Sequence, residues 1–526
     1  MHIVPRAPLP LWLAVLVAAA AGPVLDAGFP SRDWWPLTFV GIGMVLLAQR
    51  GRSGGSAFLV GWVAGEVFYL IHVSWTALYL GPIPWIALST LEALFWGVGG
   101  ILLTLAYRWV PRAFPTLLGR LGLLPVVLGG LWVLREYVTG TWPYGGFSWG
   151  RVAESQSTSP LAPLVAWLGI SGVSFVMVWL VAFLLELLAT LEVRTSSRAF
   201  LAGIAVALVF AIPAWPATTH GTTRIAAVQG NGPAGYFDDA PLGAVFDTQV
   251  KETLRIPTSQ VTGSKKVDMV VWPEGAAMPD PTRDPDSGAI LDGLSRTFHA
   301  PFVVGTITER DNRLYNTSLT WEAGKGAVDF YDKKHPVPFG EYVPDRAFWR
   351  PFAPALIDLI GRDYTPGTRS NVFSVGNVRA GVSICFDIVD DQLLTDMMHG
   401  GAQVILAETN NADFGETDEN QQQLGIARLR ANETGRALVN ISTVGSSQII
   451  APDGSTNSSI PPFRPGHMVA DVPLGTSTTP ATLLSRGIEF LVAGLGLFGV
   501  LVAFGGRRYS GFPALADTKR PFPPRR

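Results

Sequence analysis

Residues 379–385 read RAGVSIC, a short apolar run that ends at the chain's one cysteine, Cys385. Runs of this length and composition are typical of strands that are buried on both faces. Similar runs recur at residues 224–229, 268–272, 302–308, 316–321, 328–331, 404–408, 437–443 and 447–451. Helical patterns lie between some of them, at residues 242–256, 287–298, 390–399 and 420–434. Strands alternating with helices predict an α/β domain.

The composition separates this domain from the rest of the chain. Residues 222–482 carry 52 charged residues, whereas residues 1–221 carry 19 and no lysine. The whole chain of 526 residues is 48% hydrophobic and 15% charged, against about 25% charged in ordinary globular domains. This excludes a disordered chain. The net charge of −2 provides no basic field for binding nucleic acid.

Eight apolar segments approach or exceed the length that a membrane-spanning helix needs, about 20 residues. They lie at residues 9–27, 35–49, 56–80, 84–108, 121–139, 161–190, 199–217 and 486–505. We therefore predict a polytopic helical membrane domain with seven spans over residues 1–221 and a final span within residues 483–505. The seven later spans and the lack of a clear cleavage pattern argue against interpreting the first segment as a cleaved signal peptide.

Basic residues beside the spans predict the orientation of the chain. If the N-terminus is cytoplasmic, the inside flanks and the C-terminal tail carry 14 lysine and arginine residues, and the short outside loops carry only Arg32 and Arg151. We expect both termini in the cytoplasm and residues 222–482 outside the cytoplasmic membrane. Residues 506–526 are basic and rich in proline, and we expect this tail to be disordered.

Three residues with complementary chemistry follow strand-like runs. Glu274 comes after MVVWP, Lys333 after VDFYD and Cys385 after VSI. Ligands gather where strands of α/β sheets end. A carboxylate can deprotonate a thiol, the thiolate can attack an acyl carbon, and an ammonium can stabilise the oxyanion. Taken singly, each has an ordinary alternative, because a lone cysteine is more often a small buried hydrophobe and an acid after a strand is usually solvated or caps a helix.

Four motifs in this order carry a resemblance to a known family. They are Trp272–Pro273–Glu274, Tyr331–Asp332–Lys333–Lys334–His335, the stretch VPFGEYVP at residues 337–344, and Ser383–Ile384–Cys385–Phe386–Asp387. The motifs resemble those of the nitrilase superfamily. Together with the flanking spans, they resemble the apolipoprotein N-acyltransferases, the membrane-embedded members that complete bacterial lipoprotein maturation. The resemblance implies an αββα sandwich for residues 222–482 and a place in the bacterial cytoplasmic membrane.

The resemblance also implies roles for individual residues. Glu274 matches the general base, Lys333 the lysine that stabilises the oxyanion, and Cys385 the nucleophile. The next residue, Lys334, is the alternative candidate for stabilising the oxyanion, and we favour its interpretation as a solvated charge. Glu341 matches an additional active-site glutamate, which would orient Lys333 or handle the proton of an amine.

The chain departs from the family pattern at three places, one of which is the order WPY at residues 142–144, where the family usually has Phe-Pro-Trp. The supporting residues Phe386 and Asp387 stand where the family often has an aromatic residue and a glutamate, and the shorter acid leaves the role of Asp387 open. Asp413 stands where the family often has a tryptophan. We expect this difference to alter lipid contacts and to leave the chemistry intact.

The reaction that the resemblance implies is a two-step acyl transfer through a thioester on Cys385. The expected donor is a membrane phospholipid, and the expected acceptor is the α-amine of a diacylglyceryl-cysteine on an apolipoprotein. No cofactor or metal is expected, because the seven histidines are scattered and the cysteine is single. The alternatives are a membrane-tethered amidase or nitrilase with the same three residues, and a transporter or scaffold in which Cys385 has no role.

Overall fold

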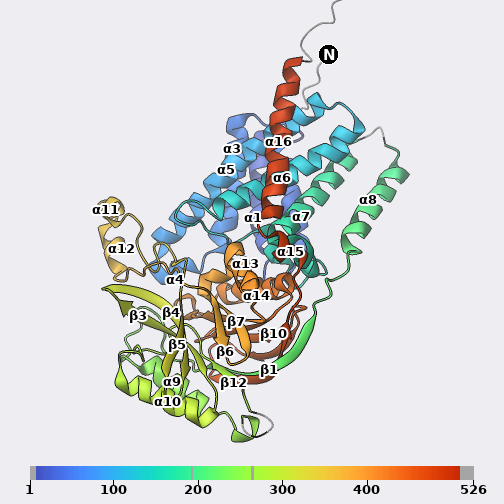
Figure 1. Ribbon diagram of the computed structural model, residues 1–526. Coiled ribbons are helices and arrows are strands. Elements are labelled where there is room, and N and C mark those ends of the chain that lie inside the picture. The colour runs from blue at the N-terminus through green and yellow to red at the C-terminus, as the bar shows by residue number, and fades with distance from the viewer. Residues whose placement is uncertain (1–6, 191–192, 262, 264–265, 510–526) are drawn as a thin grey trace, which may run out of the picture.

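The computed structural model describes residues 7–190, 193–261, 263 and 266–509. It consists of a helical part and an α/β part that covers one end of the helices (Figure 1). The helical part consists of α1 (Leu11–Asp26), α2 (Pro36–Gln49), α3 (Gly54–His72), α4 (Thr76–Leu80), α5 (Pro82–Ala113), α6 (Leu124–Thr139), α7 (Val165–Ala189), α8 (Thr195–Phe210), α15 (Pro480–Leu484) and α16 (Gly487–Tyr509). Most of the tail that we expect to be disordered, residues 510–526, lies outside the described residues.

Five stretches of the described residues are long and apolar enough to cross a membrane. They are Gly54–His72, Pro82–Ala113, Leu118–Thr139, Ala162–Ala189 and Gly487–Gly506. The other three predicted spans form shorter apolar helices, α1, α2 and α8, of 16, 14 and 16 residues. The helical character of all eight segments is confirmed, and their polytopic arrangement is consistent with an integral membrane protein.

Two six-stranded sheets form the α/β part. The first has the order β12-β1-β2-β3-β4-β5 and the second the order β11-β10-β9-β8-β7-β6. The strands of the first sheet are β1 (Thr219–Gln229), β2 (Met269–Val271), β3 (Phe302–Arg310), β4 (Arg313–Glu322), β5 (Gly326–Asp332) and β12 (Gly466–Gly475). The strands of the second are β6 (Val372–Val375), β7 (Val378–Ile384), β8 (Val404–Thr409), β9 (Ala437–Ser442), β10 (Ser447–Ile450) and β11 (Thr456–Ile460).

The sheets stack face to face, and helices cover their outer faces. Apolar side chains of both sheets, such as Val271 and Val382, share one buried core. The outer face of the first sheet packs on α9 (Ala244–Thr253) and α10 (Pro285–Phe298), and the outer face of the second packs on α13 (Asp391–His399) and α14 (Glu419–Thr434). The predicted α/β class and the layered sandwich are confirmed.

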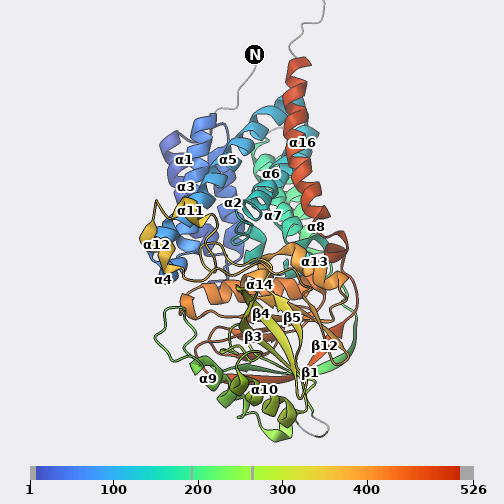
Figure 2. The ribbon, with the colours of Figure 1, turned by 60° about the vertical axis from the view of Figure 1, so that its left-hand side comes forward.

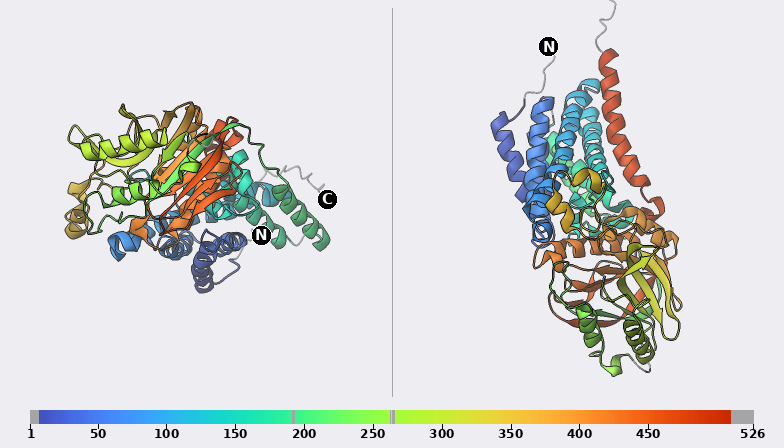
Figure 3. Two further views of the ribbon diagram at one scale, coloured as in Figure 1. Left: turned by 90° about the horizontal axis from the view of Figure 1, so that it is seen from below. Right: turned by 90° about the vertical axis from the view of Figure 1, so that its left-hand side faces the viewer.

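The helical part packs on the outer helix layer of the second sheet. One continuous core joins side chains of the bundle, such as Val165, to Leu424 and Leu429 of α14 and to Ile405 of β8. Figures 2 and 3 show α14 lying across the boundary between the two parts. Fourteen of the 16 residues of α14 are buried although its sequence is polar, so its polar side chains must find partners within the protein.

Candidate active site

The ends of strands from both sheets bring the three chemically complementary residues together. Glu274 follows β2, Lys333 follows β5 and Cys385 follows β7. In the first sheet, Thr317 pairs with Asp332, so Lys333 lies beside Asn316 and donates its backbone N–H to the Asn316 carbonyl at 2.8 Å. The electrostatic neighbours of the Cys385 thiol include Glu274, Lys333 and Glu341.

Cys385 occupies a sharp turn between β7 and a short 3₁₀ helix at Cys385–Val389. Its φ of 50° is unusual for a residue with a side chain and marks a strained position that the surroundings must hold. Asp387 supports the turn, because its carboxylate accepts hydrogen bonds from the Ile384 N–H at 3.2 Å and from the Tyr331 hydroxyl at 2.8 Å. Asp387 is fully buried, so the shorter acid serves as a support within this turn.

One lysine lies between two carboxylates. Lys333 is 1% exposed, and its Nζ lies 2.8 Å from Glu341 Oε2 and 3.9 Å from Glu274 Oε1. The Asn316 amide links the two acids, donating to Glu274 Oε1 at 2.7 Å and to Glu341 Oε1 at 2.8 Å. The Val337 N–H also donates to Glu341 Oε2, at 2.7 Å. Glu341 is therefore the carboxylate held as the direct ion-pair partner of Lys333.

The surroundings separate the proton affinities of these groups. Burial raises the pKa of Cys385 well above its usual value, and Glu274 adds to this effect, so the resting Cys385 side chain is a neutral thiol. Burial also raises the pKa of Glu274, against the opposing charge of Lys333. Burial acts in the same direction on Glu341, but the Lys333 ammonium and the hydrogen bonds from Lys333, Val337 and Asn316 together outweigh it and lower the pKa of Glu341. Glu274 is thus the more basic carboxylate and the one suited to accept a proton.

Three residues of this site are absent from the candidates chosen by sequence. Asn316 lies in β4, Glu408 lies in β8 and pairs with Ile384 of β7, and Glu419 begins α14. Burial raises the pKa values of Glu408 and Glu419 to about 8 each. Glu408 accepts from Ser318 at 2.6 Å and Glu419 from Asn411 at 2.8 Å. Glu408 could have been chosen from the sequence, because it is an acidic residue at the end of an apolar strand-like run.

The two adjacent lysines have different surroundings. The Nζ of Lys334 lies 3.6 Å from Asp396 on α13, and its side chain is 22% exposed. Lys333 points to the carboxylates described above, whereas Lys334 forms a partly exposed ion pair away from them. The structure thus places Lys333, and not Lys334, beside Glu274 and Glu341.

The helical part contributes directly to the surroundings of Cys385. The Phe386 ring lies nearly parallel to the rings of Phe147 and Trp149, at centroid distances of 5.8 and 6.1 Å. The Tyr79 hydroxyl, in α4, donates to the carbonyl of Gly340 at 2.9 Å, next to Glu341. The Cys385 turn and the Glu341 loop are therefore both in contact with the helical part. Asp413 accepts from the Tyr236 N–H at 2.7 Å at the same boundary.

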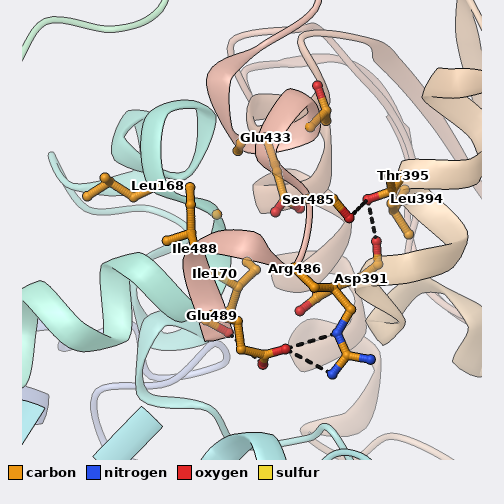
Figure 4. Close-up of a pocket in the computed structure, with 14 residues that line it drawn as sticks. Leu168, Ile170, Asp391, Leu394, Thr395, Glu433, Ser485, Arg486, Ile488 and Glu489 are labelled. Atoms are coloured by element: carbon orange, nitrogen blue, oxygen red, sulfur yellow. Dashed lines mark hydrogen bonds and ion pairs between the residues drawn. The ribbon is translucent and has the colours of Figure 1, made fainter. Parts of the chain in front are cut away.

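A small cavity elsewhere lies where the last helix meets the α/β part (Figure 4). It has a volume of about 20 Å³, room for about one water. Arg486 donates two hydrogen bonds to Glu489 beside it, and Thr395 and Ser485 share another. None of the three complementary residues lines this cavity. Among the described residues, no group of three or more histidine, cysteine, aspartate or glutamate side chains is arranged to hold a metal ion.

Two family models match the chain. One describes the N-terminal domain of apolipoprotein N-acyltransferase, over residues 21–183, and the other describes carbon-nitrogen hydrolases, over residues 224–479. An amidase from Nesterenkonia sp. is a similar solved structure, with 17% identity and a TM-score of 0.34, covering 50% of this chain and 94% of that one.

Similar curated proteins cover nearly the whole chain. The apolipoprotein N-acyltransferase of Mycolicibacterium smegmatis is 30% identical, covering 93% of this chain and 85% of that protein. The enzyme of the same name from Azotobacter vinelandii is 28% identical, covering 90% and 91%, and the one from Geobacter metallireducens is 26% identical, covering 88% and 89%. With its helical part, its α/β sandwich, its buried Glu274 and Lys333 and its half-buried Cys385, the chain belongs to the apolipoprotein N-acyltransferase family of the nitrilase superfamily.

Proposed function

We propose that this acyltransferase moves a fatty acyl chain from a membrane phospholipid to the α-amine of a diacylglyceryl-cysteine on apolipoproteins, through a thioester on Cys385. The observation that carries the proposal is the contact between the Cys385 turn and the helical part, through Phe386, Phe147 and Trp149. An acyl carrier at this boundary is within reach of substrates that are anchored in a membrane.

In the first step, Glu274 takes the proton of Cys385 and the thiolate attacks the sn-1 ester carbonyl of the phospholipid. Lys333 and a backbone N–H near residue 386 stabilise the oxyanion. The carbon–oxygen bond breaks, Glu274 returns the proton to the leaving oxygen, and a lysophospholipid departs. The neutral resting thiol and the raised pKa of Glu274 support Glu274 as the base.

In the second step, the α-amine of the apolipoprotein attacks the thioester carbonyl. An amide bond forms, the carbon–sulfur bond breaks, and the amine proton passes through Glu274 back to the sulfur of Cys385. Glu341 keeps Lys333 charged and oriented through both steps, a role supported by the 2.8 Å ion pair. Phe386 and Asp387 support the nucleophile turn.

We further propose eight membrane spans, with both termini in the cytoplasm and the α/β part outside the cytoplasmic membrane. The first residues of α1 and the last of α16 lie at the end of the helical part remote from the α/β part (Figure 2). The excess of basic flanking residues on that side supports a cytoplasmic location. Three helices shorter than the usual span can cross the hydrocarbon core only where the bilayer thins or flanking residues reach its interface.

Mass spectrometry of the purified enzyme tests the covalent step. After incubation with a phospholipid of defined acyl chains, we expect one added acyl group on Cys385, which an apolipoprotein-derived diacylglyceryl peptide then removes as its N-acyl product. Cys385→Ser should remain folded and lose the transfer activity. Acyl transfer at near the normal rate by Cys385→Ser would contradict the proposal, and release of free fatty acid with no N-acyl peptide would favour a hydrolase.

A further inference from the structure

Arg362 is a cation in contact with the Glu341 side of the site, and it has no anionic partner among the described residues. Other arginines of this segment are paired with carboxylates: Arg346 with Asp363 at 3.1 Å, Arg350 with Asp358 at 2.9 Å and Arg369 with Asp332 at 3.8 Å. Within the part of the chain that the structure describes, no carboxylate oxygen lies within 4.0 Å of the Arg362 guanidinium. A partly buried cation without a counter-ion suggests a place for an external anion.

The hydrogen bonds of Arg362 are few and long. Its terminal nitrogens donate to the Tyr79 hydroxyl at 3.4 Å and the Tyr364 hydroxyl at 3.5 Å, beyond the usual range for N–H···O bonds. Its Nε is buried and has no partner among the described residues. A guanidinium carries five N–H donors in a planar fork that matches the oxygens of a phosphate or carboxylate, so most of its donor capacity is unused here.

Aromatic rings hold this guanidinium in place without neutralising it. Its central carbon lies 3.6 Å from the centroid of the Tyr236 ring and 5.7 Å from that of Tyr364. Cation–π contacts of this kind orient an arginine without using its N–H donors. Asp413 and Glu341 contribute negative potential from beyond ion-pair distance.

Arg362 lies between α4 of the helical part and the loop that carries Glu341. Tyr79 belongs to α4 of the helical part, and the Tyr364 N–H donates to the carbonyl of Glu341 at 3.1 Å. The surroundings include exposed apolar side chains, Leu78 on α4 and Phe237, whose ring lies 5.9 Å from that of Tyr79. An anion bound here would have apolar surface beside it and the ion pair of Lys333 and Glu341 close by.

We propose that Arg362 binds the phosphodiester of the phospholipid acyl donor and so positions its ester carbonyl for Cys385. The inference rests on the proposed function and specifies how the donor is recognised. A phospholipid matches both the unpaired guanidinium and the apolar side chains beside it, since it supplies a phosphate for the one and acyl chains for the other. A free phosphate ion would contact only the guanidinium.

The test compares two acyl donors that differ in the phosphate group. Full-length enzyme is incubated in detergent micelles with 1-palmitoyl-2-oleoyl phosphatidylethanolamine or with 1-palmitoyl-2-oleoyl glycerol, and the rate of Cys385 acylation is measured by mass spectrometry. Arg362→Gln should lower the ratio of the phospholipid rate to the diacylglycerol rate by about tenfold or more, the scale of a lost charge-assisted hydrogen bond. The rate ratio of Arg362→Lys should lie between those of the unsubstituted enzyme and Arg362→Gln, because lysine keeps the charge and lacks the planar fork of donors.

Arg350→Gln is the matched control, since Arg350 lies in the same segment and already pairs with Asp358; its donor ratio should stay unchanged. If Arg362→Gln and Arg362→Lys each lose the same proportion of the acylation rate with both donors, the substitutions act generally, on Glu274, and not on phosphate binding. That result would overturn the proposed site. Inorganic phosphate at 10 mM should not slow the acylation of Cys385. If phosphate does slow it, if Arg362→Gln abolishes this inhibition and if the donor ratio is unchanged, the site binds a free anion instead. No acyl adduct in the unsubstituted enzyme would contradict the proposed function itself.

Discussion

Two carboxylates lie beside one ammonium in this site, and their positions give them different tasks. Glu341 lies 2.8 Å from Lys333 and Glu274 lies 3.9 Å from it. The closer acid is held ionised, and the more distant one keeps a raised affinity for a proton. Environments that separate the pKa values of two neighbouring acids are a general means of assigning one of them to proton transfer.

Glu341→Gln should move the acid limb of the acylation rate to lower pH. The charge of Glu341 raises the pKa of Glu274, so its removal lowers that pKa, and Lys333, freed from its closest partner, acts in the same direction. We expect a shift of about one pH unit and a lower plateau rate, because the base is weaker. The measurement is the rate of Cys385 acylation between pH 4 and 9.

Lys334→Gln provides the control for this profile. The substitution removes a charge one residue from Lys333, but Lys334 pairs with Asp396. Its acid limb should coincide with that of the unsubstituted enzyme. A limb that stays in place in Glu341→Gln, or moves to higher pH, would contradict the electrostatic relation between the two glutamates.

At the scale of elements, two arginines fix the end of the nucleophile turn. Arg151, from the loop before α7, forms two hydrogen bonds with Asp391 at 2.8 and 3.2 Å and a third with the Val389 carbonyl at 3.2 Å. Arg430 of α14 also contacts Asp391, at 2.6 Å, and Val389, at 2.8 Å. The helical part and α14 thus meet at the residues that follow Cys385.

Arg151→Gln should loosen this connection. It leaves Asp391 with one buried cationic partner in place of two, and breaking a buried ion pair costs about 3 kcal/mol. We expect a lower apparent Tm of the detergent-solubilised protein and slower acylation of Cys385. Arg255→Gln removes an arginine that is exposed beside Glu252, and it should change neither quantity appreciably. An Arg151→Gln protein that matched the original in both would show that the connection is dispensable.

The elements differ in how far the sequence determines them. The strand ending at Cys385 could be predicted because an apolar run buried on both faces leaves its pattern in the local sequence. The burial of α14 could not, because its partners lie far away in the chain: Gln422 accepts from Trp75 and Trp149 at 3.1 and 2.8 Å. Asn316 is similar, since its contact with both Glu274 and Glu341 depends on strand register and on the loop that carries Glu341.

At the scale of the whole molecule, buried acids make stability depend on pH. Burial raises the pKa of Glu408 to about 8, above the value of about 4.3 in an unfolded chain. The folded state therefore keeps a proton that the unfolded state loses, and stability falls as pH rises from about 4 to 8. Glu408 Oε2 also has no hydrogen-bond partner among the described residues, so no donor at this oxygen stabilises the ionised form.

Glu408→Gln should remove this part of the pH dependence. The amide has nearly the same shape, stays neutral and can still accept from Ser318. Relative to the original protein, its apparent Tm should be higher at pH 8 and the difference should vanish near pH 4, as measured by thermal unfolding in detergent. Identical pH profiles of Tm for the two proteins would indicate that Glu408 is already ionised in the folded state.

The proposed orientation of the whole chain is testable because Cys385 is the single cysteine. Cys385→Ser supplies a background without thiols, into which Gly54→Cys or Gly293→Cys is introduced. Both glycines are exposed, and an added side chain meets no atom within 4 Å at either. Gly54 begins α3 just after Arg52, which donates to the Leu9 carbonyl next to the start of α1, at the end of the helical part remote from the α/β part (Figure 2). Gly293 lies in α10 on the outer face of the first sheet.

With both termini in the cytoplasm, a membrane-impermeant maleimide added to intact spheroplasts should label Gly293→Cys and leave Gly54→Cys unlabelled until the membrane is opened. Gly203→Cys, on the exposed side of the 16-residue helix α8, should resist the reagent under both conditions, because lipid excludes the charged probe and a thiol in hydrocarbon stays protonated. Labelling of Gly54→Cys in closed spheroplasts would invert the topology. Labelling of Gly203→Cys would instead remove α8 from the spans, and the α/β part could then lie outside only if another short helix, α1 or α2, also failed to cross.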